Sequence, residues 1–196
     1  IFAKKFTCIL DENLKIDSTI LSKLENNKDS KTCIFGFTWV IHKILTENKN
    51  NEILKNFFSN LSQSSILHIG GWKKLTDLSI DKKQFNKECS EFFNTDMDKV
   101  IDLYGMTEQL GIVYPDCEYG YKHVPVFSEI LIRNTHSLEV QNDGESGFIQ
   151  VISPIPNSYP GISLLTDDLG EILGRDNCPC GRKGTYFIFK KRSEMA

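Results

Sequence analysis

Residues with four kinds of ligand-binding chemistry stand together after one short apolar stretch, Val100–Leu103. They form the sequence Tyr104-Gly105-Met106-Thr107-Glu108. An aromatic ring can stack on a nucleobase, a glycine lets the backbone approach a ligand, and a hydroxyl can meet a phosphate oxygen. The carboxylate can hold Mg²⁺ beside that phosphate. We therefore predict a nucleotide site here, although the same sequence would also suit a strand that runs into an ordinary turn.

Two other segments could contribute to such a site. The sequence Gly70-Gly71-Trp72-Lys73 follows a predicted strand at residues 65–69, and its glycines could let the backbone lie against a planar base. The segment Thr166-Asp167-Asp168-Leu169-Gly170 places two carboxylates after a predicted β segment, where they could accept hydrogen bonds from a ribose diol. A tight turn for the first segment and a solvated turn for the second remain open alternatives.

Three cysteines and one histidine could bind a metal ion. Cys117 and His123 form one pair, and Cys178 and Cys180 form another within the sequence Cys-Pro-Cys-Gly. Three thiolates and an imidazole suit tetrahedral Zn²⁺, and four protein ligands would make the site structural because no position stays open for water. The alternative is that the two pairs never meet.

The other cysteines, Cys8, Cys33 and Cys89, stand in apolar surroundings, which predicts small core residues.

The elements that must position these residues change in type along the chain. Strands predicted at residues 6–10, 32–35, 65–69 and 100–103 alternate with helices, which is typical of a parallel sheet. Short β segments follow at residues 127–132, 148–152, 162–165 and 186–189. We therefore predict an α/β fold, with a parallel βαβ sheet in an α/β nucleotide-binding subdomain (residues 1–123) followed by an antiparallel, β-rich subdomain (residues 124–196).

Composition excludes several classes of protein. The 196 residues carry a net charge of −3 with interspersed signs, which gives no reason to expect nucleic acid as a partner. No apolar run reaches the roughly 20 residues that a membrane-spanning helix needs. Six cysteines without a secretory signal favour a reducing compartment, so we expect a cytoplasmic protein. The chain begins with Ile1 and not with Met, which suggests part of something longer.

The order of the three candidate nucleotide segments, a glycine pair, then Tyr-Gly-Met-Thr-Glu, then Thr-x-Asp-Leu-Gly, is that of adenylate-forming enzymes. More narrowly, the chain resembles the acyl-protein synthetase family of bacterial luminescence, the LuxE type, from about Thr32 to its end. The segments that carry this resemblance are Ile34–Thr38, Ile69–Leu75, Tyr104–Gly111, Tyr114–Cys117 and Tyr121–His123. Phenylacetate-CoA ligases are more distantly similar, through the Tyr104 segment and Cys178–Arg182.

The resemblance implies an ATP-dependent ligase that activates a fatty acid as acyl-AMP and passes the acyl group to a protein cysteine. It implies ATP, Mg²⁺ and a structural Zn²⁺ as cofactors, and acyl-transferase and reductase subunits as partners. By motif position it assigns adenine stacking to Tyr104, framing of the adenine to Gly70 and Gly71, phosphate contact to Thr107, Mg²⁺ to Glu108, ribose to Asp168, and ribose or phosphate to Arg192. Arg192 could equally be solvent-exposed in a basic tail.

Two parts of the resembled family have no counterpart in this sequence. The phosphate-binding loop would precede the chain and the C-terminal domain with the acyl-accepting cysteine would follow it, so we expect the fragment alone to be inactive. A phenylacetate-type acyl-CoA ligase and a non-catalytic, zinc-stabilised binding module remain alternative functions.

Overall fold

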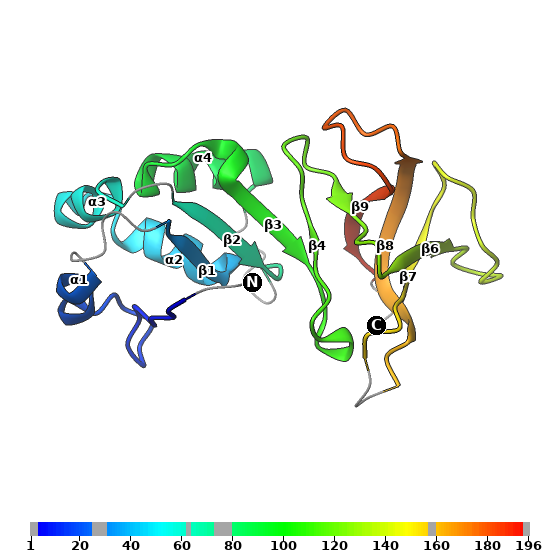
Figure 1. Ribbon diagram of the computed structural model, residues 1–196, viewed down its shortest axis with the longest axis horizontal. Helices are drawn as coiled ribbons and strands as arrows, with labels where there is room; N and C mark the ends of the chain where they lie inside the picture. The colour runs from blue at the N-terminus through cyan, green and yellow to red at the C-terminus, as the bar shows by residue number, and fades with distance from the viewer. Residues whose placement is uncertain (1–3, 25–30, 62–63, 73–79, 157–159, 194–196) are drawn as a thin grey trace. The chain divides into compact units, whose positions relative to one another are not determined.

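The computed structural model describes residues 4–24, 31–61, 64–72, 80–156 and 160–193 (Figure 1). The chain divides into two compact units, Ile1–Val100 and Ile101–Ala196. The predicted subdomain boundary between residues 123 and 124 stays a prediction. Lys73 lies outside the described residues.

The first unit contains a parallel pair of strands joined by helices. Strand β1 (Cys33–Phe37) pairs with β2 (Ser65–Ile69), and Cys33 lies opposite Ser65. Between them the chain forms α2 (Thr38–Glu47) and α3 (Glu52–Ser59), as Figure 1 shows. The buried positions of these helices recur every three or four residues, so one face of each helix is apolar. The predicted α/β character and parallel pairing are confirmed.

Two more α-helices complete the first unit, α1 (Ser18–Leu24) and α4 (Lys82–Phe93). The carboxylate of Asp81 accepts a hydrogen bond from the backbone N–H of Gln84, which caps the start of α4. Asn94 adopts the left-handed conformation at its end. The core that these helices cover includes Ile41, Phe58, Ile66, Phe85, Cys89 and Phe93. A 3-10 turn, η3 (Met97–Lys99), then leads to β3 (Val100–Tyr104).

The predicted first strand at residues 6–10 is wrong. Only Leu10 is paired there, in an isolated antiparallel bridge with Ile16. A strand needs a neighbour to bond its backbone, and β propensity cannot supply one. Cys89 is buried as expected, but Cys8 and Cys33 are exposed. Cys33 lies on the outward face of β1, where exposed and half-buried residues alternate.

The second unit is mainly antiparallel, as predicted. The chain leaves β3 through η4 (Thr107–Gln109) and returns in β4 (Tyr114–Pro115), which pairs antiparallel with β3. A separate five-stranded sheet has the order β5-β9-β8-β7-β6. Its strands are β5 (Lys122–His123), β6 (Glu129–Arg133), β7 (Ser146–Ile152), β8 (Ser163–Arg175) and β9 (Thr185–Arg192). Ile130, Ile149, Val151 and Phe187 are fully buried in its core.

Strand β8 is much longer than the predicted segment 162–165. It bonds to β7 on one side and to β9 on the other, and this pairing keeps the backbone extended as far as Arg175. Asp167 and Asp168 therefore lie inside a strand, not in a turn after it.

None of the helices in the described residues is both long enough and apolar enough to cross a membrane.

Candidate functional site

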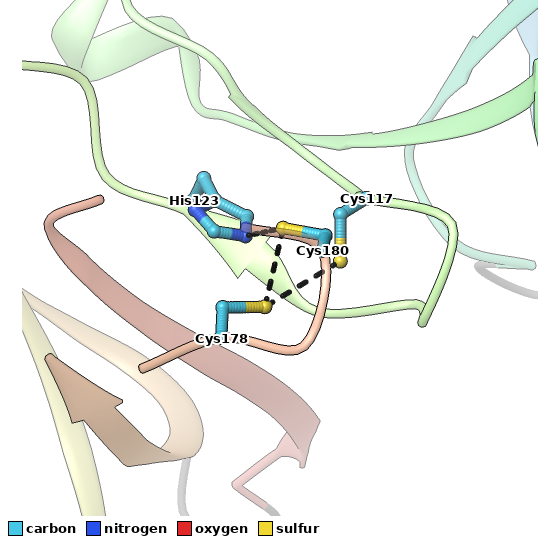
Figure 2. A group of neighbouring side chains, drawn as sticks. All are labelled: Cys117, His123, Cys178 and Cys180. Carbon is cyan, nitrogen blue, oxygen red and sulfur yellow. Dashed lines mark hydrogen bonds between the residues drawn. The ribbon is translucent and has the colours of Figure 1, made fainter. Parts of the chain in front are cut away.

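Cys117, His123, Cys178 and Cys180 converge in the second unit. Their ligand atoms all lie within 4.8 Å of one another (Figure 2). The Sγ atoms of Cys117 and Cys178 are 4.0 Å apart, and those of Cys178 and Cys180 are 3.3 Å apart. The Sγ atom of Cys180 lies 3.3 Å from Nε2 of His123. The two predicted pairs therefore meet, although Cys117 and Cys178 are 61 residues apart in sequence.

These distances fit one small tetrahedral ion. With zinc–sulfur bonds of about 2.3 Å and a zinc–nitrogen bond of about 2.05 Å, ideal tetrahedral edges are about 3.8 Å between sulfurs and about 3.6 Å from sulfur to nitrogen. The three closest contacts, of 3.3 to 4.0 Å, lie close to these edges, and the other separations are at most 4.8 Å. All three cysteines are free thiols, so no disulfide explains their approach. The donor set suits a closed zinc site.

Two tight turns of the same type present the sulfurs. The carbonyl of Cys117 accepts from the N–H of Gly120 at 2.8 Å, and the carbonyl of Cys178 accepts from the N–H of Gly181 at 3.0 Å. Both glycines have positive φ, 76° and 82°, a conformation that side chains disfavour. The turns project from the β4–β5 and β8–β9 connections, and the two strands β5 and β9 pair at their base. Pairing of these strands brings the two turns together.

Aromatic rings cover one side of the cluster. The ring of Tyr186 is stacked on that of His123, with 5.8 Å between centroids and an interplanar angle of 21°. Tyr121 packs on Tyr186, and Tyr119 stacks in turn on Tyr121. Cys117, Cys178 and Tyr186 are buried, so the ligands stand largely out of water.

The electrostatic setting favours metal binding. Burial, followed by the charge of Arg182, lowers the pKa of His123, which favours the neutral ring that binds metals. Burial raises the pKa of the Cys178 thiol to about 11. Burial alone would also raise the pKa of Cys180. Hydrogen bonds from the Arg182 backbone and the neighbouring thiols outweigh this effect and bring the pKa below its ordinary value. A cation among these groups would favour the thiolates.

An ion triad with two buried members adjoins the cluster, and sequence reasoning missed it. Nζ of Lys122 donates to Oδ2 of Asp102 and to Oδ1 of Asp116, each at 3.0 Å. The Lys122 side chain is 6% exposed and that of Asp116 is 4% exposed. The available signal was that Asp116 and Lys122 each directly precede a predicted metal ligand.

Tyr104 and Asp168, both predicted to bind nucleotide, are in contact. The hydroxyl of Tyr104 donates to Oδ2 of Asp168 at 2.8 Å, across 64 residues of sequence. Burial, and then the charge of Asp168, raises the pKa of Tyr104. The Tyr104 ring is stacked on that of Phe189, with centroids 5.7 Å apart. One face of the ring is thus already covered by Phe189.

Thr107 and Glu108 lie in the exposed turn η4, and Gly105 is half-buried just before it. The hydroxyl of Thr107 donates to Oε2 of Glu108 at 3.1 Å. Gln109, which sequence reasoning did not select, is 1% exposed and anchors this turn. Its side-chain amide donates to the carbonyl of Gly161 at 3.1 Å. The turn leaves the hydroxyl and the carboxylate accessible to a ligand.

Arg192 lies opposite Asp168 in the pairing of β8 with β9. Its guanidinium contacts Oδ2 of the neighbouring Asp167 at 3.5 Å, and both side chains are exposed. The backbone thus places Arg192 near Asp168, while its side chain stands in solvent.

Gly70 and Gly71 lie in the first unit, directly after β2. The Gly70 carbonyl accepts from the hydroxyl of Thr38 at 2.5 Å, and Nδ1 of His68 lies 2.9 Å from the same hydroxyl. Since a carbonyl can only accept, the hydroxyl donates to it and Nδ1 of His68 carries the proton that Thr38 accepts. His68 is a buried core residue, as predicted, and its Nδ1 lies within hydrogen-bond distance of the Thr38 hydroxyl. Thr38 and His68 fix the backbone at Gly70.

The sequence of this chain is similar to those of two bacterial ligases. The long-chain-fatty-acid–luciferin-component ligases of Aliivibrio fischeri and Vibrio harveyi are 24% and 26% identical to this chain over 175 residues. These matches cover 88% of this chain but 44% of each relative, so the chain spans less than half of their length.

Solved structures show the same fold. A 2-hydroxyisobutyryl-CoA ligase in complex with 2-HIB-AMP and CoA has a TM-score of 0.66 and 15% sequence identity. The match covers 89% of this chain and 36% of the ligase chain. The luciferase-like enzyme of the mealworm Zophobas morio has a TM-score of 0.53 and 17% sequence identity. The match covers 90% of this chain and 41% of the mealworm enzyme. The fold is that of adenylate-forming enzymes. The family model "Acyl-protein synthetase, LuxE" matches residues 2–196, and the chain therefore belongs to this family.

Proposed function

We propose that this chain forms part of an ATP-dependent ligase that activates a fatty acid as acyl-AMP and transfers the acyl group to a protein cysteine. The observation that carries the proposal is the Tyr104–Asp168 contact, because it joins two nucleotide motifs that are distant in sequence. Membership of the acyl-protein synthetase family supports the same activity. We propose further that a phosphate-binding loop and a C-terminal domain come from elsewhere in a longer protein, and that this fragment alone is inactive.

Each candidate residue then has a role. Tyr104 would stack on adenine, Gly70 and Gly71 would frame it, and Asp168 would accept hydrogen bonds from the ribose hydroxyls. Thr107 would donate to a phosphate oxygen, and Glu108 would hold Mg²⁺ beside it. The Thr107 hydroxyl, as a donor, and the cation held by Glu108 would offset negative charge on the phosphates during adenylation. Gly105 would allow the close approach of the backbone to the nucleotide, and Arg192 would pair with ribose or phosphate oxygens.

The Cys117, His123, Cys178 and Cys180 cluster is proposed to hold a structural zinc ion. Four protein ligands leave no position for a substrate, so the ion would stabilise the second unit without taking part in the reaction. Acyl-transferase and reductase subunits are the proposed partners. The cytoplasm is the proposed compartment, because it supplies ATP and keeps such thiols reduced.

The test measures two activities, on this chain and on the longest reading frame that contains it. Fatty-acid-dependent exchange of pyrophosphate into ATP reports adenylation. Label from a radioactive fatty acid should then stay on protein and be released by hydroxylamine, as a thioester would be. Label on CoA would instead support the phenylacetate-type ligase. Absence of both activities from the longer protein would leave the zinc-stabilised binding module.

A further inference from the structure

The ion triad of Asp102, Asp116 and Lys122 lies at the base of the turn that carries two of the metal ligands. Asp116 directly precedes Cys117, and Lys122 directly precedes His123. Asp116 and Lys122 face each other in an antiparallel bridge, so their ion pair closes the turn. The positions of both ligands therefore depend on this pair.

Asp102 ties the same turn to strand β3. The backbone N–H of Asp116 donates to the Asp102 carbonyl at 3.0 Å. Nζ of Lys122 reaches the Asp102 carboxylate at 3.0 Å and its carbonyl at 3.4 Å. Asp102 precedes Tyr104 by two residues in β3, so Lys122 connects the metal-binding turn to the strand that ends at the nucleotide motif.

Burial of the Lys122 ammonium and the Asp116 carboxylate is unfavourable, whereas the Asp102 side chain stays 28% exposed. Apolar side chains of the same volume would often stabilise the fold as well or better. The triad instead orients the backbone, because three contacts from the Lys122 Nζ atom hold the turn against β3. Groups hydrogen-bonded to metal ligands commonly contribute about 10- to 100-fold in metal affinity, and Lys122 acts on two ligands through the backbone of their turn.

We propose that Lys122 is a positioning residue for the metal centre, and that it links metal binding to the conformation of β3 before Tyr104. The inference rests on the metal site of the proposed function. Lys122 holds the turn against β3, so that Cys117 and His123 stand in place before the metal arrives. Because such coupling is reciprocal, metal binding in turn stabilises the contact between the turn and β3.

The first measurement is Co²⁺ and Zn²⁺ affinity of the chain, by competition with a chromophoric chelator. Lys122→Met should weaken both by about 10- to 100-fold and alter the visible absorption of bound Co²⁺, which reports the ligand geometry. The matched control is Lys190→Met, which removes a lysine from the surface pair with Glu171 and should leave affinity unchanged. Equal affinity of Lys122→Met and the parent would overturn the proposal.

Two further variants separate positioning from stability. Val151→Ala, in the fully buried core of the same unit, lowers stability without touching the turn and should keep parental metal affinity. The triple variant Asp102→Asn, Asp116→Asn, Lys122→Met removes the three charges together, so it should fold and still bind Co²⁺ weakly. Parental affinity in the triple variant, or an equal loss in Val151→Ala, would refute the positioning role.

The link to β3 has its own readout. Zn²⁺ should slow hydrogen exchange of the Asp116 amide, which bonds to the Asp102 carbonyl, in the parent but not in Lys122→Met. Unchanged exchange in a parent that binds zinc would overturn the link to β3. If the parent chain bound neither Zn²⁺ nor Co²⁺, that result would instead contradict the proposed zinc site itself.

Discussion

The Cys/His cluster and the Tyr104–Asp168 contact belong to the same unit, but their polar groups are satisfied to different degrees. The ligand atoms of three thiols and an imidazole lie within 4.8 Å of one another, an arrangement that a cation would stabilise. By contrast, the Tyr104 hydroxyl and the Asp168 carboxylate already satisfy each other. The first region thus gains most from a ligand, whereas a nucleotide at the second must compete with existing contacts.

The largest effect should come from breaking the cluster. Cys178→Ser replaces a buried thiolate ligand with a poor one, so Zn²⁺ affinity should fall by more than about 100-fold. The melting temperature with zinc should then drop to that of the chelated parent, because metal binding stabilises only the folded state. Calorimetry with and without chelator measures both. Cys33→Ser, at an exposed thiol, is the control and should behave as the parent.

Metal affinity should also depend steeply on pH. Burial raises the pKa of Cys178 to about 11, so at neutral pH its proton must leave when the metal binds. Affinity should therefore rise with pH and weaken as pH falls. The pKa of His123 is lowered, so its ring stays neutral further into the acidic range and adds little to this loss. Zinc titrations between pH 8.5 and 6 would contradict the assignment if affinity did not change.

A smaller effect is expected from Asp168→Asn, measured as affinity for a fatty acyl-sulfamoyl-adenosine, a stable mimic of the acyl adenylate. Loss of a charged acceptor for the ribose hydroxyls should weaken binding by about 10- to 100-fold, equivalent to about 1.5–3 kcal/mol. Asp167→Asn removes the same charge from the adjacent, exposed position and should change affinity little. Equal losses in both variants would point to net charge and not to a ribose contact.

The smallest effect is expected from Tyr104→Phe. This variant tests directly whether the Tyr104–Asp168 hydrogen bond competes with a nucleotide. The variant keeps the ring but loses the hydrogen bond to Asp168. The free energy of unfolding should fall by about 1.5 kcal/mol, the lower end for a bond to a charged group, because Asp168 is only half-buried. Affinity for the same mimic should not fall, because the Asp168 oxygen is released from its competing donor. Denaturant unfolding measures the loss of stability, and calorimetric titration measures the affinity for the mimic. A large loss of affinity would mean that the hydroxyl itself binds the ligand.

The amino-acid sequence by itself determined the local features of this protein. The alternation of strands with helices identified the α/β part of the chain, and the motif around Tyr104 identified the end of β3, because these patterns depend on neighbours within a few residues. The types and positions of the thiols and the imidazole also selected four residues whose ligand atoms the structure brings within 4.8 Å of one another. Family membership followed from the same short motifs.

Tertiary structure alone decided which of these residues meet. Strand pairing across 61 residues brings Cys117 to Cys178, and the extension of β8 brings Asp168 to Tyr104. The lack of strand pairing at residues 6–9 and the ion pairs of Lys122 with Asp102 and Asp116 likewise came only from the structure. The physical reason is that strand partners and buried ion pairs depend on distant backbone, whereas a sequence window records only local preference.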